Sequence, residues 1–343
     1  MNMKMRKLTR TLFCLTAAIA LANTGCERKH APAPAKAAAS NGAKMENARV
    51  ALDWTPNTNH TGLYAALENG YFSEAGFIVT IIQPPEDGAL LLTAAGKAEY
   101  AFDFQESLGP AIARKTDALP VVAVAAIINH NTSGIMSLAA SGIKRPRDLA
   151  GKRFASWGTP LVTAIIRDIV EEDGGNFGAV RMIPNNATDA ISALQTDIDA
   201  IWIYYAWDGM KARLSNIDIN YIDIGAVNPV FDFYTPVLVT NADYAAANGD
   251  SVKRFMAALS KGYRYAIDNP QQAADALLRH APELDRDLVY KSQEYLAERY
   301  QAEAPRWGEI DEGRWGAFYR WMYEKGLLET DIGAAGFTNK FLP

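Results

Sequence analysis

The sequence predicts an α/β protein of two lobes. From residue 49 onward, short apolar runs with the length of buried strands alternate with longer amphipathic runs of helical spacing. The alternation occurs twice, over residues 50–128 and again over 153–224, and an almost purely helical segment follows residue 240. Because alternating strands and helices favour a mostly parallel sheet, the two series predict two sheets, with the chain crossing between the lobes twice.

The predicted elements follow one another in a regular order. Helical runs of the first series end near Gly70, Gly76 and Gly96, where a left-handed residue can close a helix. In this series we expect strands at 50–53, 77–82, 100–104 and 121–128 and helices at 62–75, 87–96 and 105–115. In the second series we expect strands at 153–156, 180–183, 200–204 and 221–224 and helices at 160–173, 187–196 and 206–214.

Residues 1–25 have the pattern of an export signal. Basic residues precede an apolar stretch over 12–22, which is shorter than the about 20 residues that span a bilayer. Cys26 follows Gly25 as in a bacterial lipobox, although Asn23 stands where Leu is usual. We expect a lipid on Cys26, with ordinary signal cleavage nearby as the alternative. Residues 26–47 are rich in Ala and Pro, which predicts a lipid-anchored linker to the membrane.

Composition narrows the possible classes of function. The two cysteines are Cys14, inside the predicted signal, and Cys26, so we expect no disulfide, thiol nucleophile or cysteine-based metal site in the folded part. The four His residues are too scattered to suggest any metal site. The formal net charge is −5, and loss of the signal's four positive charges makes it −9, which argues against a nucleic-acid partner.

The stretch 53–62, Asp-Trp-Thr-Pro-Asn-Thr-Asn-His-Thr-Gly, joins the first predicted strand to the first predicted helix. In α/β proteins ligands bind at the carboxyl ends of strands, where loop groups and helix N–H groups converge. The same residue types also form ordinary loops, so composition alone leaves a binding role undecided. Similar polar and aromatic stretches lie at other predicted strand ends or crossings, at 103–107, 131–134, 156–160, 202–209 and 231–236.

Together these six stretches resemble a family of bacterial binding proteins that deliver thiamine pyrimidine precursors to ABC importers. The family also includes fungal pyrimidine precursor synthases. The resemblance implies a type II periplasmic binding protein fold, with 48–137 and 239–343 in lobe 1, 138–238 in lobe 2, and a hinge of two crossings near 137 and 238. It further implies a monomer in the periplasm or on the outer face of the membrane, working with a permease and a separate ATPase.

The resemblance also implies a cleft in which Trp and Tyr faces stack on a flat aminopyrimidine, while carboxylates and amides hydrogen-bond its nitrogens. For any single residue a structural role is the alternative: Trp and Tyr in strands are often core, 105–107 could cap a helix, and 131–134 could form a turn. By alternation, Trp202 and Tyr204 share one face of their strand. The ligand-binding residues implied are Asp53, Trp54, Asn57, Asn59, His60, Gln105, Glu106, Ser133, Trp157, Gly158, Trp202, Tyr205, Trp207, Asp208 and Tyr234.

Two other functions compete with the pyrimidine receptor. A pyrimidine synthase of this family needs a Lys for pyridoxal phosphate, a reactive His and a Cys-rich run, which align here with Asp103, Ser107 and 230–234. We therefore expect no enzyme activity and no cofactor. A receptor for riboflavin or another heteroaromatic remains open, because Val162 stands where the family pattern has an acidic residue. The favoured ligand is formylaminopyrimidine, a thiamine breakdown product.

Overall fold

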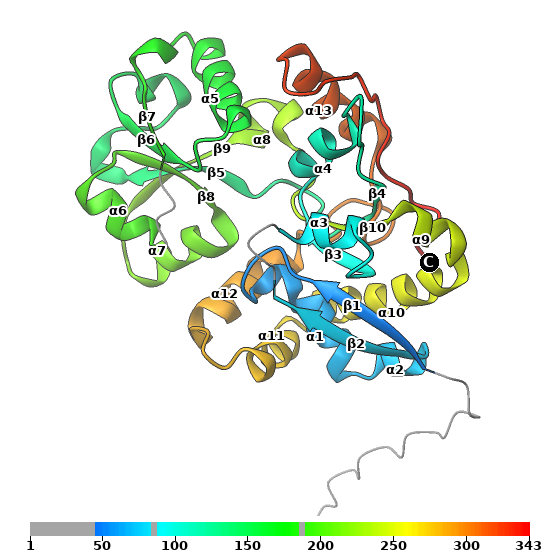
Figure 1. Cartoon of the computed structure of the whole chain (residues 1–343). Helices are drawn as coiled ribbons and strands as arrows, with labels where there is room; N and C mark the ends of the chain where they lie inside the picture. Colours follow the sequence, from blue (N-terminus) through cyan, green and yellow to red (C-terminus); the bar gives the residue numbers. More distant parts are fainter. Residues whose placement is uncertain (1–44, 84–87, 185–188) are drawn as a thin grey trace, which may run out of the picture. The chain divides into compact units, whose positions relative to one another are not determined.

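The computed structural model describes residues 45–83, 88–184 and 189–343, and these described residues form one compact unit (Figure 1). The expected signal, the lipidation site at Cys26 and all but the last residues of the linker lie outside the described residues. Within the described ranges, no helix is both long enough and apolar enough to cross a membrane.

The first sheet has five strands in the order β2-β1-β3-β10-β4. β1 pairs in parallel with β2 and β3, whereas β10 is antiparallel to both of its neighbours. The strands are β1 (Glu46–Ala51), β2 (Phe77–Ile82), β3 (Tyr100–Asp103), β4 (Val121–Ala126) and β10 (Val237–Asn241).

The second sheet repeats this plan in the order β7-β6-β8-β5-β9. β6 pairs in parallel with β7 and β8, and β5 is antiparallel to β8 and β9. In each sheet the antiparallel strand is the first strand after the chain arrives from the other lobe. The strands are β5 (Ser133–Leu138), β6 (Arg153–Ser156), β7 (Arg181–Pro184), β8 (Ala200–Tyr204) and β9 (Ile219–Asp223).

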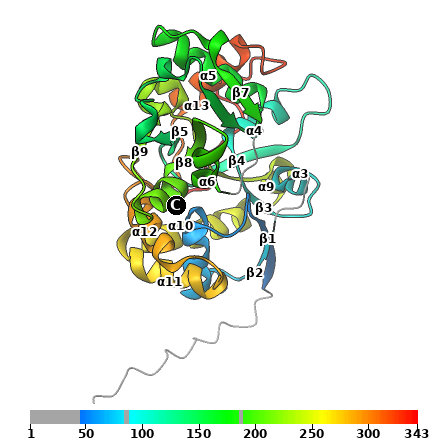
Figure 2. The ribbon, with the colours of Figure 1, turned by 90° about the vertical axis from the view of Figure 1, so that its left-hand side faces the viewer.

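Helices follow the strands in both lobes, and the C-terminal helices return to the first lobe, where α10 and α11 pack on α1 (Figures 1 and 2). The first series contains α1 (Thr61–Glu68), α2 (Tyr71–Glu74), α3 (Ala89–Ala94) and α4 (Gln105–Ile112). The second contains α5 (Pro160–Glu172), α6 (Ala190–Thr196), α7 (Met210–Leu214) and α8 (Ile224–Val227). The tail contains α9 (Ala242–Ala247), α10 (Gly249–Asp268), α11 (Pro270–His280), α12 (Arg286–Ala297) and α13 (Glu312–Glu324).

The structure corrects the expected position of the first crossing. The family resemblance places it near 137, but residues 133–137 already belong to β5 of the second sheet. The first crossing is therefore 127–132 and the second is 232–236, directly before β10. The strand β5 is missed because its sequence, Ser-Gly-Ile-Met-Ser-Leu, is buried on both faces and shows no alternation. The antiparallel β5 and β10 also make each sheet mixed.

Helices α1 and α10 approach each other through glycines. Gly62 lies against the ring of Tyr263, and a β-carbon added to Gly262 would collide with the carbonyl oxygen of Gly62 and with Ala66. This close approach brings Leu63, Ala65 and Ala66 of α1 into the core of the first lobe. It thereby fixes the helix that begins directly after the loop of the first strand.

We expect Gly262→Ala to lower the free energy of unfolding by about 1–3 kcal/mol, because the added methyl forces the two helices apart. Chemical denaturation measures this. The matched control is Gly249→Ala in the same helix, where the nearest heavy atom would be 3.8 Å from the new β-carbon. Equal stability of the two variants would contradict the packing described here.

Candidate functional site

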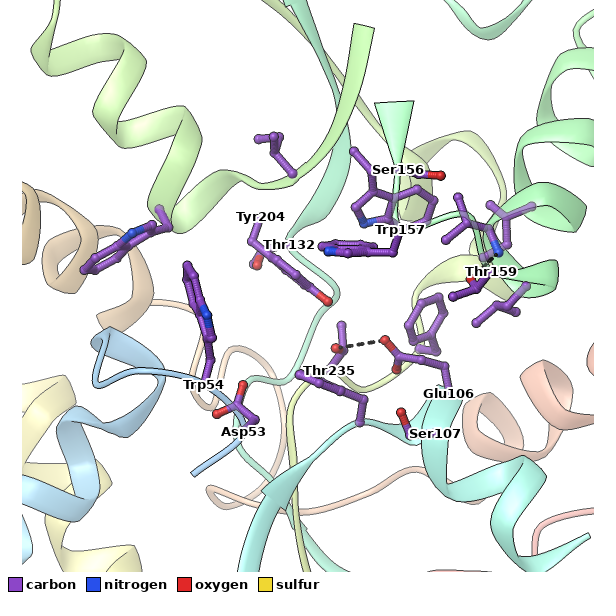
Figure 3. A pocket seen from close by; sticks show the side chains of 18 of the residues that line it. Asp53, Trp54, Glu106, Ser107, Thr132, Ser156, Trp157, Thr159, Tyr204 and Thr235 are labelled. Carbon is purple, nitrogen blue, oxygen red and sulfur yellow. Dashed lines mark hydrogen bonds between the residues drawn. The ribbon is translucent and has the colours of Figure 1, made fainter. Parts of the chain in front are cut away.

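The ends of strands and the crossings meet at a cavity of about 810 Å³. Its walls come from the loop after β1, the first turns of α4 and α5, the end of β8 with the turn that follows it, both crossings, and the end of α13. Figure 3 shows side chains from these segments facing one another. The cavity thus lies where both sheets direct their strand ends.

Two exposed indoles stand in this cavity. Trp54 is 53% exposed and Trp157 is 49% exposed, which is unusual for side chains of this size. Trp157 lies 6.1 Å from Tyr204 and 6.5 Å from Trp202 between ring centroids, with tilted planes, so it stacks on neither. In Figure 3, Tyr204 lies between Trp54 and Trp157. These rings leave free faces on which a flat ligand can stack.

Asp53 is held at the cavity wall by a buried histidine. The backbone N–H of Asn57 donates to Nδ1 of His60 at 3.2 Å, so this nitrogen must carry a lone pair. Nε2 of His60 then carries the proton and donates to Oδ1 of Asp53 at 2.5 Å. His60 is fully buried and does not line the cavity itself. It therefore orients the carboxylate and leaves Oδ2 of Asp53 available.

Glu106 brings a second carboxyl to the cavity from the first turn of α4. Its Oε1 accepts only a long hydrogen bond, 3.4 Å, from the hydroxyl of Thr235, and Oε2 has no partner among the described residues (Figure 3). Burial, reinforced by the negative charge of Asp103, raises the pKa of Glu106 to about 8. The carboxyl is therefore protonated at neutral pH and has hydrogen-bonding capacity that the protein does not use.

Asp208 provides the third carboxyl from a single π-helical turn, Tyr205–Gly209, directly after β8. Such turns are rare and occur often at functional sites. Burial raises the pKa of Asp208 to about 6. Among the described residues that line the cavity there is no Lys, Arg, His or Cys. The charge balance therefore suits an amine-bearing ligand and offers no cationic side chain to an anion.

The cavity contains nine of the fifteen residues that the resemblance implies as ligand-binding. They come from both lobes and supply all three carboxyls. The nine are Asp53, Trp54, Asn57, Asn59, Glu106, Trp157, Trp202, Trp207 and Asp208.

The other six residues do not line the cavity, and most of them support its walls. Besides His60, Gln105 is fully buried and ties the second crossing to α13, because Oε1 accepts from the N–H of Tyr234 and Nε2 donates to the carbonyl of Trp315. Tyr234 is buried beside Trp315. The rest are Ser133 in β5, Gly158 in a left-handed turn with φ of 71°, and Tyr205, which packs on Tyr221 and Tyr295.

Several lining residues are not among those the resemblance implies. Tyr204 lines the cavity instead of Tyr205, as the alternation with Trp202 indicates. Ser107, Ser156 and Thr159 lie in stretches that the sequence pattern marks. Met322, near the end of α13, and Leu327, three residues after that helix, carry no signal in the sequence. Their position depends on the return of the tail, which no local pattern records. Within the described ranges, no group of three or more His, Cys, Asp or Glu side chains could hold a metal.

The fold is that of the periplasmic binding proteins. The structure superimposes on the alkanesulfonate-binding protein SsuA of Xanthomonas axonopodis pv. citri with a TM-score of 0.65, over 87% of this chain and 99% of that protein. The sequence identity is 15%, so this likeness concerns the fold alone. The two-lobed architecture expected from the sequence is thereby confirmed.

The chain belongs to the NMT1/THI5-like family, whose model matches residues 57–273. It is 31% identical over 306 residues to a formylaminopyrimidine-binding protein of Halalkalibacterium halodurans, which covers 86% of this chain and 90% of the relative. It is 26% identical over 257 residues to a 4-amino-5-hydroxymethyl-2-methylpyrimidine phosphate synthase of Saccharomyces cerevisiae, covering 70% and 73%. The family resemblance seen in the sequence is confirmed.

The raised pKa of Glu106 has a consequence for stability. Between pH about 4.5, its ordinary pKa, and about 8, its pKa in the fold, the folded chain keeps a proton that the unfolded chain releases. Stability from this group is therefore full at low pH and is lost as the pH rises through 8. Between pH 4.5 and 8 the melting temperature of the wild type should therefore fall more than that of Glu106→Gln, because Gln does not titrate. We expect the two falls to differ by about 2–4 °C or more.

Thermal melts of the ligand-free chain at several pH values measure this difference. The control is Glu324→Gln, the same change at an exposed position on α13, which should keep the wild-type pH dependence. If Glu106→Gln and the wild type show parallel curves, Glu106 is ionised in the fold.

Proposed function

We propose that this chain is the extracytoplasmic solute-binding protein of an ABC importer and captures an aminopyrimidine precursor of thiamine. The favoured ligand is N-formyl-4-amino-5-aminomethyl-2-methylpyrimidine. One observation carries the proposal: the cavity combines free aromatic faces with three carboxyls and, among its described lining residues, no cationic side chain. The relation to a formylaminopyrimidine-binding protein supports the same ligand class.

The cavity chemistry fits an aminopyrimidine edge. Protonated Glu106 can donate its O–H to a ring nitrogen while its other oxygen accepts from the neighbouring exocyclic amine, a paired arrangement that fixes the ring in its plane. Asp53, oriented by His60, can accept a further N–H. The faces of Trp54, Trp157 and Tyr204 then contact the ring from above and below.

A ligand bound by residues of both lobes would let a permease distinguish the ligand-bound protein from the empty one. A ligand held by Asp53 and Glu106 on one lobe and by Trp157 and Asp208 on the other stabilises the closed arrangement of the lobes. The closed lobes would present a distinct surface to a permease, with transport driven by a separate ATPase. The receptor would act as a monomer in the periplasm or on the outer face of the membrane.

The cavity also argues against synthase chemistry. By the family resemblance, the Lys and the reactive His of the synthases align with Asp103 and Ser107 here, and Ser107 faces the cavity. The described lining offers no Lys to form a Schiff base with pyridoxal phosphate. We therefore assign the chain a binding function without catalysis and without a cofactor.

The proposal is tested by titrating the purified full-length chain with formylaminopyrimidine, hydroxymethylpyrimidine, riboflavin, pyridoxal phosphate and an alkanesulfonate. Tryptophan fluorescence should change on binding of either pyrimidine, because two exposed indoles become covered. Binding of riboflavin alone would keep the receptor and replace the ligand. A covalent pyridoxal adduct on one Lys would overturn the non-enzymatic assignment, and sulfonate binding would contradict the charge argument.

Removal of a stacking face should weaken binding without unfolding the protein. We expect Trp54→Ala to reduce affinity for formylaminopyrimidine by about tenfold to a hundredfold, because base–aromatic stacking contributes about 1–3 kcal/mol. Calorimetric titration measures the change. Tyr323→Ala, which removes an aromatic ring 44% exposed and outside the cavity, is the matched control and should bind normally. Equal affinities in both variants would exclude Trp54 from the site.

The predicted anchor is a separate element of the proposal. We expect protein extracted from membranes to carry a diacylglyceryl group on Cys26, since Cys26 follows Gly25 at the end of the export signal. Intact-mass analysis should show the added mass, and Cys26→Ser should remove it and release the protein into the soluble fraction. An unmodified chain that begins near residue 26 would instead indicate ordinary cleavage.

A further inference from the structure

Helix α12 contacts one cavity-lining segment of each lobe from outside the cavity. In the first lobe, the hydroxyl of Ser292 lies 2.6 Å from the hydroxyl of Thr58, which belongs to the loop after β1. In the second lobe, the ring of Tyr295 packs on the ring of Tyr205, with centroids 5.3 Å apart. Tyr205 begins the π-helical turn that carries Asp208. The helix therefore stands behind segments that bring ligand-binding groups to the cavity from opposite sides.

The π-helical turn of the second lobe rests on the first lobe. Ala206, its second residue, is buried in the core cluster of the first lobe that contains Leu52 and Leu63. Trp207 packs against a second hydrophobic cluster, which residues of α1, α11 and α12 form. Helix α12 also lies against α7, which continues from the turn (Figure 1). The position of the turn therefore depends on contacts between the lobes.

Tyr205 connects the contact with α12 to the whole turn. Its ring covers Gly209, the last residue of the turn, where an added β-carbon would lie 2.5 Å from Cδ2 of Tyr205. Its backbone N–H donates to the carbonyl of Thr132 in the first crossing at 2.9 Å, and the hydroxyl of Tyr221 donates to the same carbonyl at 2.9 Å. One ring thus contacts both ends of the turn. A shift of this ring would move the carboxyl of Asp208.

Tyr295 is itself held in place. The guanidinium carbon of Arg299 lies 3.6 Å from the centroid of its ring, a cation–π contact. Nη1 of Arg299 donates to the carbonyl of Tyr295 at 2.8 Å. The carbonyl of Arg299 in turn accepts from the N–H of Asn129, in the first crossing, at 2.9 Å. These contacts restrict the ring of Tyr295, so that it can support Tyr205 in one position.

Resting on the proposed function, we infer that Tyr295 is a positioning residue for ligand binding. It does not line the cavity, and it acts through Tyr205, whose turn holds Asp208 at the cavity wall. Because a hydrogen bond weakens steeply when its geometry is lost, displacement of the turn removes affinity that the second lobe contributes. Since Ser292 contacts the loop of the first lobe, α12 sets the spacing between the ligand-binding groups of the two lobes.

The test compares variants of Tyr295 in the full-length chain by calorimetric titration with formylaminopyrimidine, after melting has shown each variant to be folded. Tyr295→Ala should bind about three- to tenfold more weakly, because it removes an aromatic pair that holds the turn. Tyr295→Phe keeps the ring and should bind within about twofold of the wild type. The matched control is Tyr71→Ala on α2, which removes a half-buried ring that lies under the amino group of Lys261, outside the cavity, and should bind normally.

A double-mutant cycle separates positioning from a general loss of structure. In an Asp208→Asn background the effect of Tyr295→Ala should shrink to about twofold or less, since the carboxylate that the turn positions is already gone. In a Trp157→Ala background, where the removed ring directly follows β6, the effect should stay at about three- to tenfold. An effect that is the same in every background, or that shrinks equally in both, would overturn the inference.

A measurement without ligand distinguishes this inference from the proposed function. In the chain labelled with 5-fluorotryptophan, the fluorine resonance of Trp207, assigned by its loss in Trp207→Phe, should shift in Tyr295→Ala. It should stay in place in Tyr295→Phe and in Tyr71→Ala. An unshifted resonance in Tyr295→Ala would show that the turn does not depend on Tyr295, whatever the ligand. A shifted resonance together with no binding of any pyrimidine to the wild type would support the support of the turn by Tyr295 and overturn the proposed function.

Discussion

The arrangement of the two lobes depends on how one carboxylate joins the two crossings. Asp232, in the second crossing, accepts from the backbone N–H of Asn131 at 2.8 Å and pairs with Nδ1 of His130 at 2.6 Å, both in the first crossing. Arg314 of α13 reaches the same carboxylate at 3.0 Å, while its guanidinium lies over the ring of Tyr234. The two crossings and the C-terminal tail therefore meet at one point, and charge-assisted hydrogen bonds hold them there.

The strand order of the two sheets also joins the lobes. β10 lies between β3 and β4, and it reaches this place only after the chain has built the second lobe. The first sheet is thus incomplete until the second crossing has formed. Because each sheet receives its antiparallel strand from a crossing, ladder hydrogen bonds fix the ends of the crossings.

The cavity follows from this placement. Strand ends from both sheets converge beside the crossings, so carboxyls at 53, 106 and 208 face one space although the chain separates them widely. Each is held in its own way: Asp53 by His60, Glu106 by the first turn of α4, and Asp208 by a π-helical turn. Burial raises the pKa of Glu106 and of Asp208, and no cationic side chain stands among the described lining residues. Oε2 of Glu106 has no hydrogen-bond partner among the described residues.

The sequence by itself determined the α/β class, the two series and the loop at 53–62, because apolar periodicity and polar strand ends are local signals. Through the family resemblance it also marked nine of the residues that the structure brings into the cavity. Only the tertiary structure decided that Ser133–Leu138 is a strand, since burial on both faces removes alternation. It alone decided that His60 and Gln105 lie behind the wall, and that Met322 and Leu327 lie in it. These outcomes depend on contacts between segments far apart in the chain, which no local pattern encodes.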